Sequence, residues 1–385
     1  MNYLIKNANI FTAAETDFET GYLQIKNGKI EAIGDMTQCP PAEGYTVLDA
    51  CGKNVYPGFI DAHCHLGICE DSIGFEGEDC NEMTNPCTPQ MRAIDAINPC
   101  DRCFTDALAA GVTAVVTGPG SGNPIGGQSA AIKTVGKCID DMILKAPLAM
   151  KMAFGENPKT VYNERKQTPM SRMGTAAIIR EALEKTKRYM EKKDADFDAK
   201  LEALIPVLKG EIPIHTHAHR ADDIFTAVRI AKEYNLNYVL VHCTEGYLIA
   251  DELAKAESRI ISGPVLGDRC KPELRNQTAA GPGIAAKAGV QVAICTDHPV
   301  IPIQYLPISA GLCVREGMDY RAALKAITIV PACHMGFDQR IGSLEVGKDA
   351  DFSIYSGDAL EMSGKCMATF VNGEKVFEHV SCNFA

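Results

Sequence analysis

The feature that most constrains the fold of this 385-residue chain is a long central region in which short apolar segments alternate with helical stretches. "FTDALAAG" precedes "VTAVVTGPG", "ADDIFTAVRIAKEYN" precedes "YVLVHC", and "AAGPGIAAKAG" precedes "VQVAICTD". Regular alternation of strand and helix indicates a parallel sheet covered by helices. Over roughly 280 residues the pattern favours a (β/α)8 TIM barrel over an open sheet.

Both ends of the chain have a different, β-rich pattern. Asn27-Gly28 and Asn372-Gly373 are two-residue turns that typically join antiparallel strands. The segments predicted to be strands are 3–12, 22–26, 29–33, 350–355 and 368–379. Because the ends of a domain often lie close together, we expect residues 1–56 and 340–385 to form one small β-sandwich. Residues 57–339 would then form the barrel.

Composition and charge limit the class of protein. The chain is 46% hydrophobic and 23% charged, which is typical of a globular protein in water. Its net charge of −11 argues against a nucleic-acid partner, because phosphate binding needs a basic face. We expect a small-molecule substrate. The sequence leaves open whether the chain forms a homo-oligomer. No apolar run reaches the roughly 20 residues that span a bilayer, and the N-terminus lacks a signal-peptide pattern, so we expect no membrane partner and a cytoplasmic location.

The sixteen cysteines are spread along the chain, and without a signal peptide we expect them to be reduced thiols. Cys100 and Cys103 form one CxxC, with Cys69, Cys80 and Cys87 upstream. A structural zinc site is the alternative interpretation. It is disfavoured because neither a second CxxC nor a histidine pair completes a tetrahedral ligand set.

Histidines cluster at the ends of the predicted barrel strands, where the chemistry of a TIM barrel is found. Side chains two residues apart on a strand face the same side, so Asp61, His63 and His65 share one face in "PGFIDAHCHLG". Seven of the nine histidines occupy or follow predicted strand ends: His63, His65, His215, His217, His219, His242 and His298.

The same alternation predicts the orientation of residues in later strands. In "YVLVHC" it directs Val239 and Val241 toward the surrounding helices and His242 into the barrel. In "VQVAICTD" it directs Asp297 into the barrel. A single buried histidine is more often a hydrogen-bonded core residue than a ligand, but convergence from several strands favours a site with nitrogen and oxygen ligands. Such a site suits Zn²⁺, Fe²⁺ or Mn²⁺.

Lys151 in "LAMKMAFGENPK" is expected to face the barrel interior, where a charged amine is unfavourable unless it is neutralised or paired. Next to metal, a deprotonated lysine can take up CO2 and become a carbamate that bridges two cations. Glu156, just beyond the strand, is the alternative ligand and would need no modification. A third interpretation is that Lys151 forms an ion pair with a neighbouring carboxylate and that no metal is involved.

Taken together, these motifs resemble the amidohydrolase superfamily, and within it the imidazolonepropionase-related and prolidase-like amidohydrolases. The resemblance covers essentially the whole chain. It is carried by "PGFIDAHCHLG" (57–67), "HAHRADD" (217–223), "VHCTEG" (241–246), "CTDHP" (295–299) and "IGSLEVGKDADF" (341–352).

The resemblance implies one or two bound divalent ions, and zinc is favoured over iron or manganese. A fourth-strand ligand is implied at Lys151, carboxylated or not, or at Glu156. The sequence departs from the family pattern in the "GENPK" stretch and in the additional His215 and His219. The other implied metal ligands are His63, His65, His217, His242 and Asp297.

The implied activity is hydrolysis of a C–N bond in an amide, a cyclic amide or a peptide-like small molecule by a water that the metal activates. Asp297 is the expected general base, and His242 or His298 would stabilise the developing oxyanion. His298 could instead orient a ligand. The alternatives are a deaminase or deacetylase on the same scaffold, or a catalytically silent homologue, which should lack some of these ligands.

Overall fold

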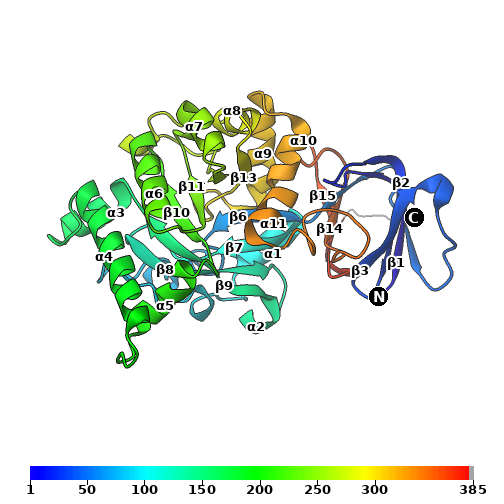
Figure 1. The fold of residues 1–385 in the computed structure, drawn as a ribbon. Coiled ribbons are helices and arrows are strands. Elements are labelled where there is room, and N and C mark those ends of the chain that lie inside the picture. The colour runs from blue at the N-terminus through cyan, green and yellow to red at the C-terminus, as the bar shows by residue number, and fades with distance from the viewer. Residues whose placement is uncertain (381–385) are drawn as a thin grey trace.

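The structure is a computed structural model that describes residues 1–380, and it contains two eight-stranded β-sheets. Figure 1 shows the sheet of the chain ends beside a larger, helix-covered barrel. The strands of this terminal sheet are β1 (Tyr3–Ile10), β2 (Phe18–Lys26), β3 (Lys29–Asp35), β4 (Thr46–Asp49), β5 (Asn54–Pro57), β14 (Phe352–Tyr355), β15 (Cys366–Val371) and β16 (Glu374–Glu378).

The terminal sheet joins the two ends of the chain, as the sequence predicts. Its strand order is β16-β15-β14-β5-β1-β2-β3, with β4 beside β1, so β5 and β14 connect the N-terminal and C-terminal segments. Both expected hairpin turns form with positive φ at Asn27-Gly28 and Asn372-Gly373. Residues 381–385, the end of the predicted terminal unit, lie outside the described residues.

The second sheet is the expected barrel, and it is nearly closed. The first and last strands lie side by side. Near their carboxyl ends, the Asp297 N–H donates to the His63 carbonyl at 3.2 Å and the His65 N–H donates to the His298 carbonyl at 2.8 Å. In spatial order the strands are β6 (Phe59–Cys64), β7 (Val112–Thr117), β8 (Ile125–Lys133), β9 (Ile143–Ala153), β10 (Ile214–Ala218), β11 (Tyr238–His242), β12 (Arg259–Ser262) and β13 (Gln291–Ile294).

One strand departs from the parallel sheet that the sequence predicts. β8 runs antiparallel to both β7 and β9, while the other neighbouring strands of this sheet pair in parallel. The reason lies in the connections. Seven residues, 118–124, separate β7 from β8, which is too short for a crossover helix but sufficient for an antiparallel return.

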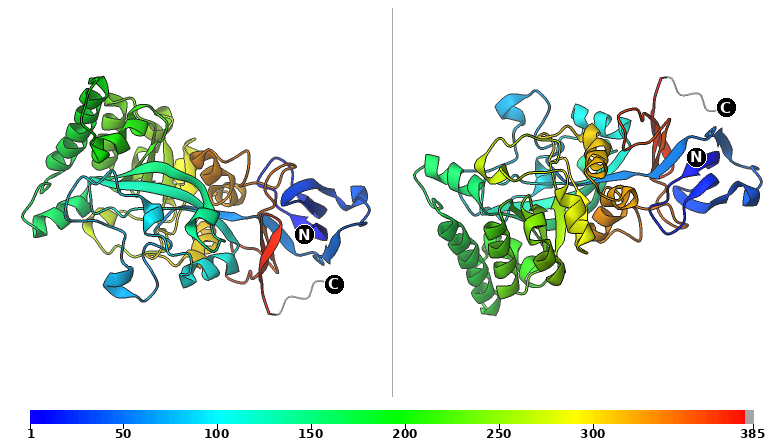
Figure 2. Two further views of the ribbon diagram at one scale, coloured as in Figure 1. Left: turned by 90° about the horizontal axis from the view of Figure 1, so that it is seen from below. Right: turned by 90° about the horizontal axis from the view of Figure 1, so that it is seen from above.

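Helices cover the outside of the barrel, and Figure 2 shows the terminal sheet extending away from them. The long helical region between β9 and β10 includes two helices, α4 and α5, that are separated by the polar segment 192–198. No described helix is both long and apolar enough to cross a membrane. The helices are α1 (Arg102–Ala109), α2 (Ile139–Met142), α3 (Glu156–Glu164), α4 (Arg172–Glu191), α5 (Ala199–Leu208), α6 (Ala221–Glu233), α7 (Ala250–Lys255), α8 (Gly281–Lys287), α9 (Leu306–Arg315), α10 (Tyr320–Ala326) and α11 (Ile329–Met335).

The centre of the barrel corrects the predicted orientation of β11. Val239 and Val241 were expected to face the helices, but they pack in an apolar cluster with Ala293 of the last strand and with Cys295 directly after it. Leu240 packs instead with residues of the surrounding helices. The two valines therefore lie inside the barrel, below its mouth.

A buried cation connects the barrel to the returning C-terminal segment. Lys133, at the end of β8, is 5% exposed, and its Nζ lies 2.9 Å from Asp349 Oδ2 and 3.1 Å from Asp351 Oδ1. It also donates to the side chain of Asn372. Two carboxylates and an amide therefore replace the water that this ammonium loses on folding.

Lys133→Met should reduce the free energy of unfolding by about 3 kcal/mol, because it leaves the buried Asp351 without its cation and removes the buried cation of Asp349, which keeps the more exposed Lys29 and Arg340. Lys29 is a matched control, since its Nζ contacts the same Asp349 at 2.5 Å but the side chain is 49% exposed. Lys29→Met should cost less than about 1 kcal/mol. Urea denaturation of both variants measures the difference, and equal losses would contradict the assigned role of Lys133.

Candidate metal centre

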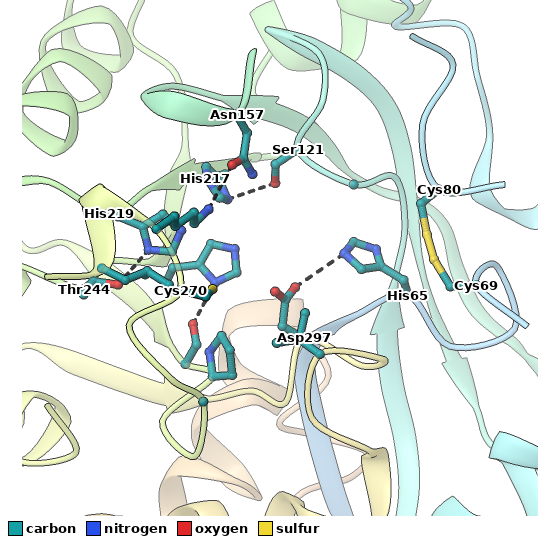
Figure 3. A pocket seen from close by; sticks show the side chains of 18 of the residues that line it. His65, Cys69, Cys80, Ser121, Asn157, His217, His219, Thr244, Cys270 and Asp297 are labelled. Carbon is teal, nitrogen blue, oxygen red and sulfur yellow. Dashed lines mark hydrogen bonds and ion pairs between the residues drawn. A yellow bond between two sulfur atoms is a disulfide. The ribbon is translucent and has the colours of Figure 1, made fainter. Parts of the chain in front are cut away.

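A cavity of about 620 Å³ opens at the mouth of the barrel. In Figure 3, His65 and Asp297 lie on one side of this cavity, and His217 and His219 lie on the other. The first group comes from the residue after β6 and the segment after β13, and the second comes from β10 and the residue after it. The structure therefore gathers side chains from opposite sides of the barrel, as the positions of the histidines predict.

Asp61 positions the end of the first strand. Its carboxylate accepts the His63 N–H at 3.1 Å, the Thr296 N–H at 3.1 Å and the Thr296 hydroxyl at 2.5 Å. The pairing of β6 with β7 shifts register between Asp61 and Cys64, so the simple alternation of faces ends here. Burial raises the pKa of Asp61 to about 7, although these hydrogen bonds oppose the shift.

The imidazoles of His65 and His242 are held in one tautomer. The Nδ1–H of His65 donates to the carbonyl of Gly118 at 2.7 Å, and the Nδ1–H of His242 donates to the carbonyl of Gly263 at 2.7 Å. A carbonyl can only accept, so Nδ1 carries the proton in each ring and Nε2 retains its lone pair. A histidine that ligates metal through Nε2 is typically held in this way.

The backbone explains why His242 reaches the mouth although Val241 faces the interior. His242 and Cys243 have φ of 71° and 49°, in the left-handed region that non-glycine residues seldom adopt. Asp297, after the last strand, has φ of 56°. Both side chains are therefore placed by local departures from extended geometry, which period-two alternation does not describe.

Lys151 lies inside the cluster. Its side chain is buried, and its Nζ lies 3.0 Å from His63 Nε2. Burial lowers the pKa of Lys151 to about 8, so an appreciable fraction of this amine is neutral near pH 7 to 8. Glu156 lies elsewhere. It begins α3, its carboxylate accepts the Glu273 N–H at 3.3 Å, and it lines a second cavity of about 480 Å³.

Asp297 carries the negative charge of the centre. Its Oδ1 lies 3.4 Å from Nε2 of both His63 and His65. Burial would raise the pKa of this carboxyl, but His242, His65 and Lys151 outweigh that effect and hold the pKa at about 2. Potential ligand atoms of His63, His242 and Asp297 all lie within 4.8 Å of one another.

His219, which the sequence analysis noted only as a departure from the family pattern, belongs to a second set of potential ligands. Potential ligand atoms of His217, His219 and His242 also lie within 4.8 Å of one another. His215 belongs to neither set. It is buried, and its ring nitrogens have no hydrogen-bond partner among residues 1–380.

His298 also lies outside both sets. Its Nδ1 accepts the Ile303 N–H at 3.2 Å, and the residue is not among the described residues that line the cavity. Only its backbone carbonyl contacts the centre directly, by accepting the His65 N–H. This placement fits a residue that orients others better than one that contacts a substrate.

The sequence did not identify Glu273, which adjoins the second set. This carboxylate is 1% exposed, and its Oε1 lies 3.8 Å from His217 Nε2 and 3.6 Å from His219 Nε2. It pairs with Lys271 at 2.7 Å. Glu273 belongs to the loop after β12, where no periodic pattern predicts an orientation, so only its position after a barrel strand could have indicated it.

The loop after β6 corrects the prediction that all the cysteines are reduced. Cys69 and Cys80 form a disulfide, and both residues line the cavity (Figure 3). Cys103, of the CxxC pair, donates to the Asp101 carboxylate at 3.0 Å. No cysteine belongs to a potential metal-ligand group within residues 1–380.

The chemistry of these side chains fits a divalent metal. Burial lowers the pKa of His242 to about 4 and those of His63 and His217 well below the ordinary value, so the imidazoles are neutral at pH 7. The Nε2 of His217 is buried and has no hydrogen-bond partner in the described chain. Neutral imidazoles beside an ionised carboxylate are the ligands that zinc and iron prefer.

Comparison with known proteins identifies the family. A model described as the amidohydrolase family matches residues 54–381. The chain belongs to the amidohydrolase family. A solved amidohydrolase from Thermotoga maritima MSB8 is 41% identical to it, with a TM-score of 0.95, and the match covers 98% of this chain and 100% of that one.

Two further proteins are similar in sequence to most of this chain. Amidohydrolase tasK from Hapsidospora irregularis is 27% identical over 93% of this chain, although the chain spans 40% of that relative's length. An imidazolonepropionase from Porphyromonas gingivalis is 24% identical over 92% of this chain and 91% of its own length. The resemblance inferred from the motifs is confirmed.

The two fourth-strand candidates of this amidohydrolase can be separated by metal analysis. Lys151→Ala should remove bound metal more completely than Glu156→Ala, because Lys151 lies beside His63 while Glu156 lines a separate cavity. Elemental analysis of both purified variants gives metal per chain. Equal occupancy in the two variants would count against Lys151 as a ligand.

Proposed function

We propose that this amidohydrolase is a metal-dependent hydrolase that cleaves a C–N bond in a small amide, cyclic amide or peptide-like molecule. The observation that carries the proposal is the convergence of five potential ligands at the mouth of the barrel. His65, His217, His242 and Asp297 line one cavity, and His63 Nε2 lies 3.4 Å from Asp297 Oδ1. A catalytically silent homologue should lack some of these side chains, and all five are present. A cavity of about 620 Å³ also suits a small molecule.

In this proposal one or two divalent ions, zinc above iron or manganese, are held by these five residues and by Lys151. Bound metal would supply a water of lowered pKa and polarise the carbonyl that is cleaved. Lys151 contributes as an amine or, after uptake of CO2, as a carbamate, and its lowered pKa supports the second form because CO2 reacts with the neutral amine.

The residues of the chain have separate roles in the proposed reaction. Asp297 is the only carboxylate in the two potential ligand sets, so it is the proposed general base that accepts the proton of the attacking water. It would then transfer that proton to the leaving nitrogen. His242 belongs to both sets and is the proposed oxyanion stabiliser. His298 acts through its backbone bond to His65, as a positioning residue.

The bond type is supported by similarity as well as by geometry. The relative named imidazolonepropionase matches over most of both chains, and an imidazolone is a cyclic amide. A screen of cyclic ureides, N-acyl amino acids and dipeptides tests the proposed class. Release of ammonia from aminated heterocycles, without cleavage of any amide, would favour the deaminase alternative, and release of acetate alone would favour a deacetylase.

Asp297→Asn should reduce the rate of hydrolysis by about 10²- to 10⁴-fold, the usual contribution of general base catalysis, because an amide does not accept the proton. The fold should persist, with a melting temperature close to that of the unmodified protein. Asp251→Asn, an exposed substitution in the first turn of α7, is the matched control and should retain full activity. Full activity in Asp297→Asn would contradict the assignment.

A further inference from the structure

One basic side chain lines the cavity at the mouth of the barrel. Among residues 1–380, Lys271 is the only lysine or arginine in this lining, and it belongs to the loop after β12. Three acidic residues also line the cavity. Asp297 belongs to the candidate metal centre, while Glu78 and Asp268 are exposed, so that water and salt screen their charges. An anionic group of a substrate would therefore find its cationic partner in Lys271.

Two acceptors hold the Lys271 ammonium in place. Its Nζ lies 2.7 Å from Glu273 Oε1 and donates to Asn157 Oδ1 at 2.9 Å. Glu273 is itself fixed, because its other oxygen, Oε2, accepts the Glu156 N–H at 3.0 Å. An ammonium has three N–H donors. Two of them are occupied within the described part of the chain, and the side chain is 25% exposed, so one donor remains for a bound molecule.

Asn157 supplies further donors beside this ammonium. It lines the cavity, and Figure 3 shows it on the same side as His217 and His219. Its Oδ1 accepts from Lys271, so its Nδ2 group, with two N–H donors, is left for another partner. An ammonium and an amide N–H next to each other match the two oxygens of a carboxylate, and the bond from the ammonium is strengthened by charge.

These donors lie close to the proposed site of cleavage. Glu273 Oε1, which pairs with Lys271, is also 3.8 Å from His217 Nε2, so a single oxygen atom separates the ammonium from an imidazole of the candidate metal centre. In an N-acyl amino acid, three bonds of about 1.3 to 1.5 Å each connect the carboxyl carbon to the carbonyl carbon of the amide. A carboxylate at that position can contact Lys271 while the amide lies at the metal centre.

We propose that the substrate carries a carboxylate next to the amide that is cleaved, and that Lys271 and Asn157 bind this carboxylate. The inference rests on the proposed function, because it narrows the substrates of the same site. The class becomes N-acyl amino acids, dipeptides, and cyclic amides with a carboxylate on the carbon attached to the ring nitrogen. Lys271 and Asn157 determine specificity and take no part in breaking the bond.

Matched pairs of substrates test this class without any variant. Each compound is prepared as the free acid and as its carboxamide, which has nearly the same shape but no charge. Hydrogen bonds to a charged group correspond to about 10- to 100-fold in binding, so metal-loaded protein should cleave the acids with a kcat/KM higher by that factor. Equal values for acids and carboxamides would overturn the inference and leave the proposed function standing. Absence of hydrolysis of either form would overturn both.

Variants of Lys271 test which residue provides the preference. Lys271→Met should raise the KM for the acids by about 10- to 100-fold with little change in kcat, and should affect the carboxamides much less. Lys271→Arg keeps the charge and should retain the preference for acids. Lys159→Met is the matched control, because Lys159 is also half-buried but lines the separate cavity of about 480 Å³. It should leave both KM values unchanged.

Two results with these variants would overturn the assignment of Lys271. One is an equal loss for acids and carboxamides in Lys271→Met, since that would mean that the lysine serves only to hold Glu273. The other is an undiminished preference for acids in Lys271→Met. Asn157→Ala provides a second measurement, and it should raise the KM for the acids by about 2- to 10-fold, the usual contribution of one hydrogen bond. An unchanged KM in Asn157→Ala would remove Asn157 from the proposed site.

Discussion

The hydrogen bonds of one buried carboxylate, Asp61, position the residues of the candidate metal centre. Asp61 accepts the N–H of His63 on the first barrel strand and both the N–H and the hydroxyl of Thr296 after the last strand. Desolvation makes a buried carboxylate unfavourable, and these three donors offset that cost. Because the donors are His63 itself and the neighbour of Asp297, the contacts that close the barrel also align two of the potential metal ligands.

The fold followed from the sequence wherever a simple periodicity applied. The paired glycine turns and alternating apolar residues of the chain ends predict the terminal sheet, and the order of strands and helices predicts the barrel. The prediction was wrong at β8, because the alternation of strands and helices was taken to indicate a sheet that is parallel throughout. The actual connection from β7 is too short for a crossover, and that constraint on chain length could have been applied from the sequence.

The sequence predicted which residues form the candidate site better than it predicted how their side chains are oriented. His63, His65, Lys151, His217, His242 and Asp297 were all identified in advance, and the structure brings them together. Alternation alone misplaced Val239 and Val241, because His242 reaches the mouth through a positive φ that no side-chain pattern specifies. Glu273 reaches the imidazoles from a loop, and the disulfide of Cys69 and Cys80 depends on the path of another loop. Tertiary contacts determine both, and neither has a local sequence signal.

The central claim is that divalent metal at this centre drives amide hydrolysis, and it is tested most directly by removing and restoring the metal. Once a substrate has been found by the amide screen, protein stripped by a strong chelator should lose hydrolysis. Activity should return on addition of about one to two equivalents of zinc, iron or manganese per chain, in proportion to the metal bound. Full hydrolysis by protein that contains less than about a tenth of an equivalent of any metal would contradict the account.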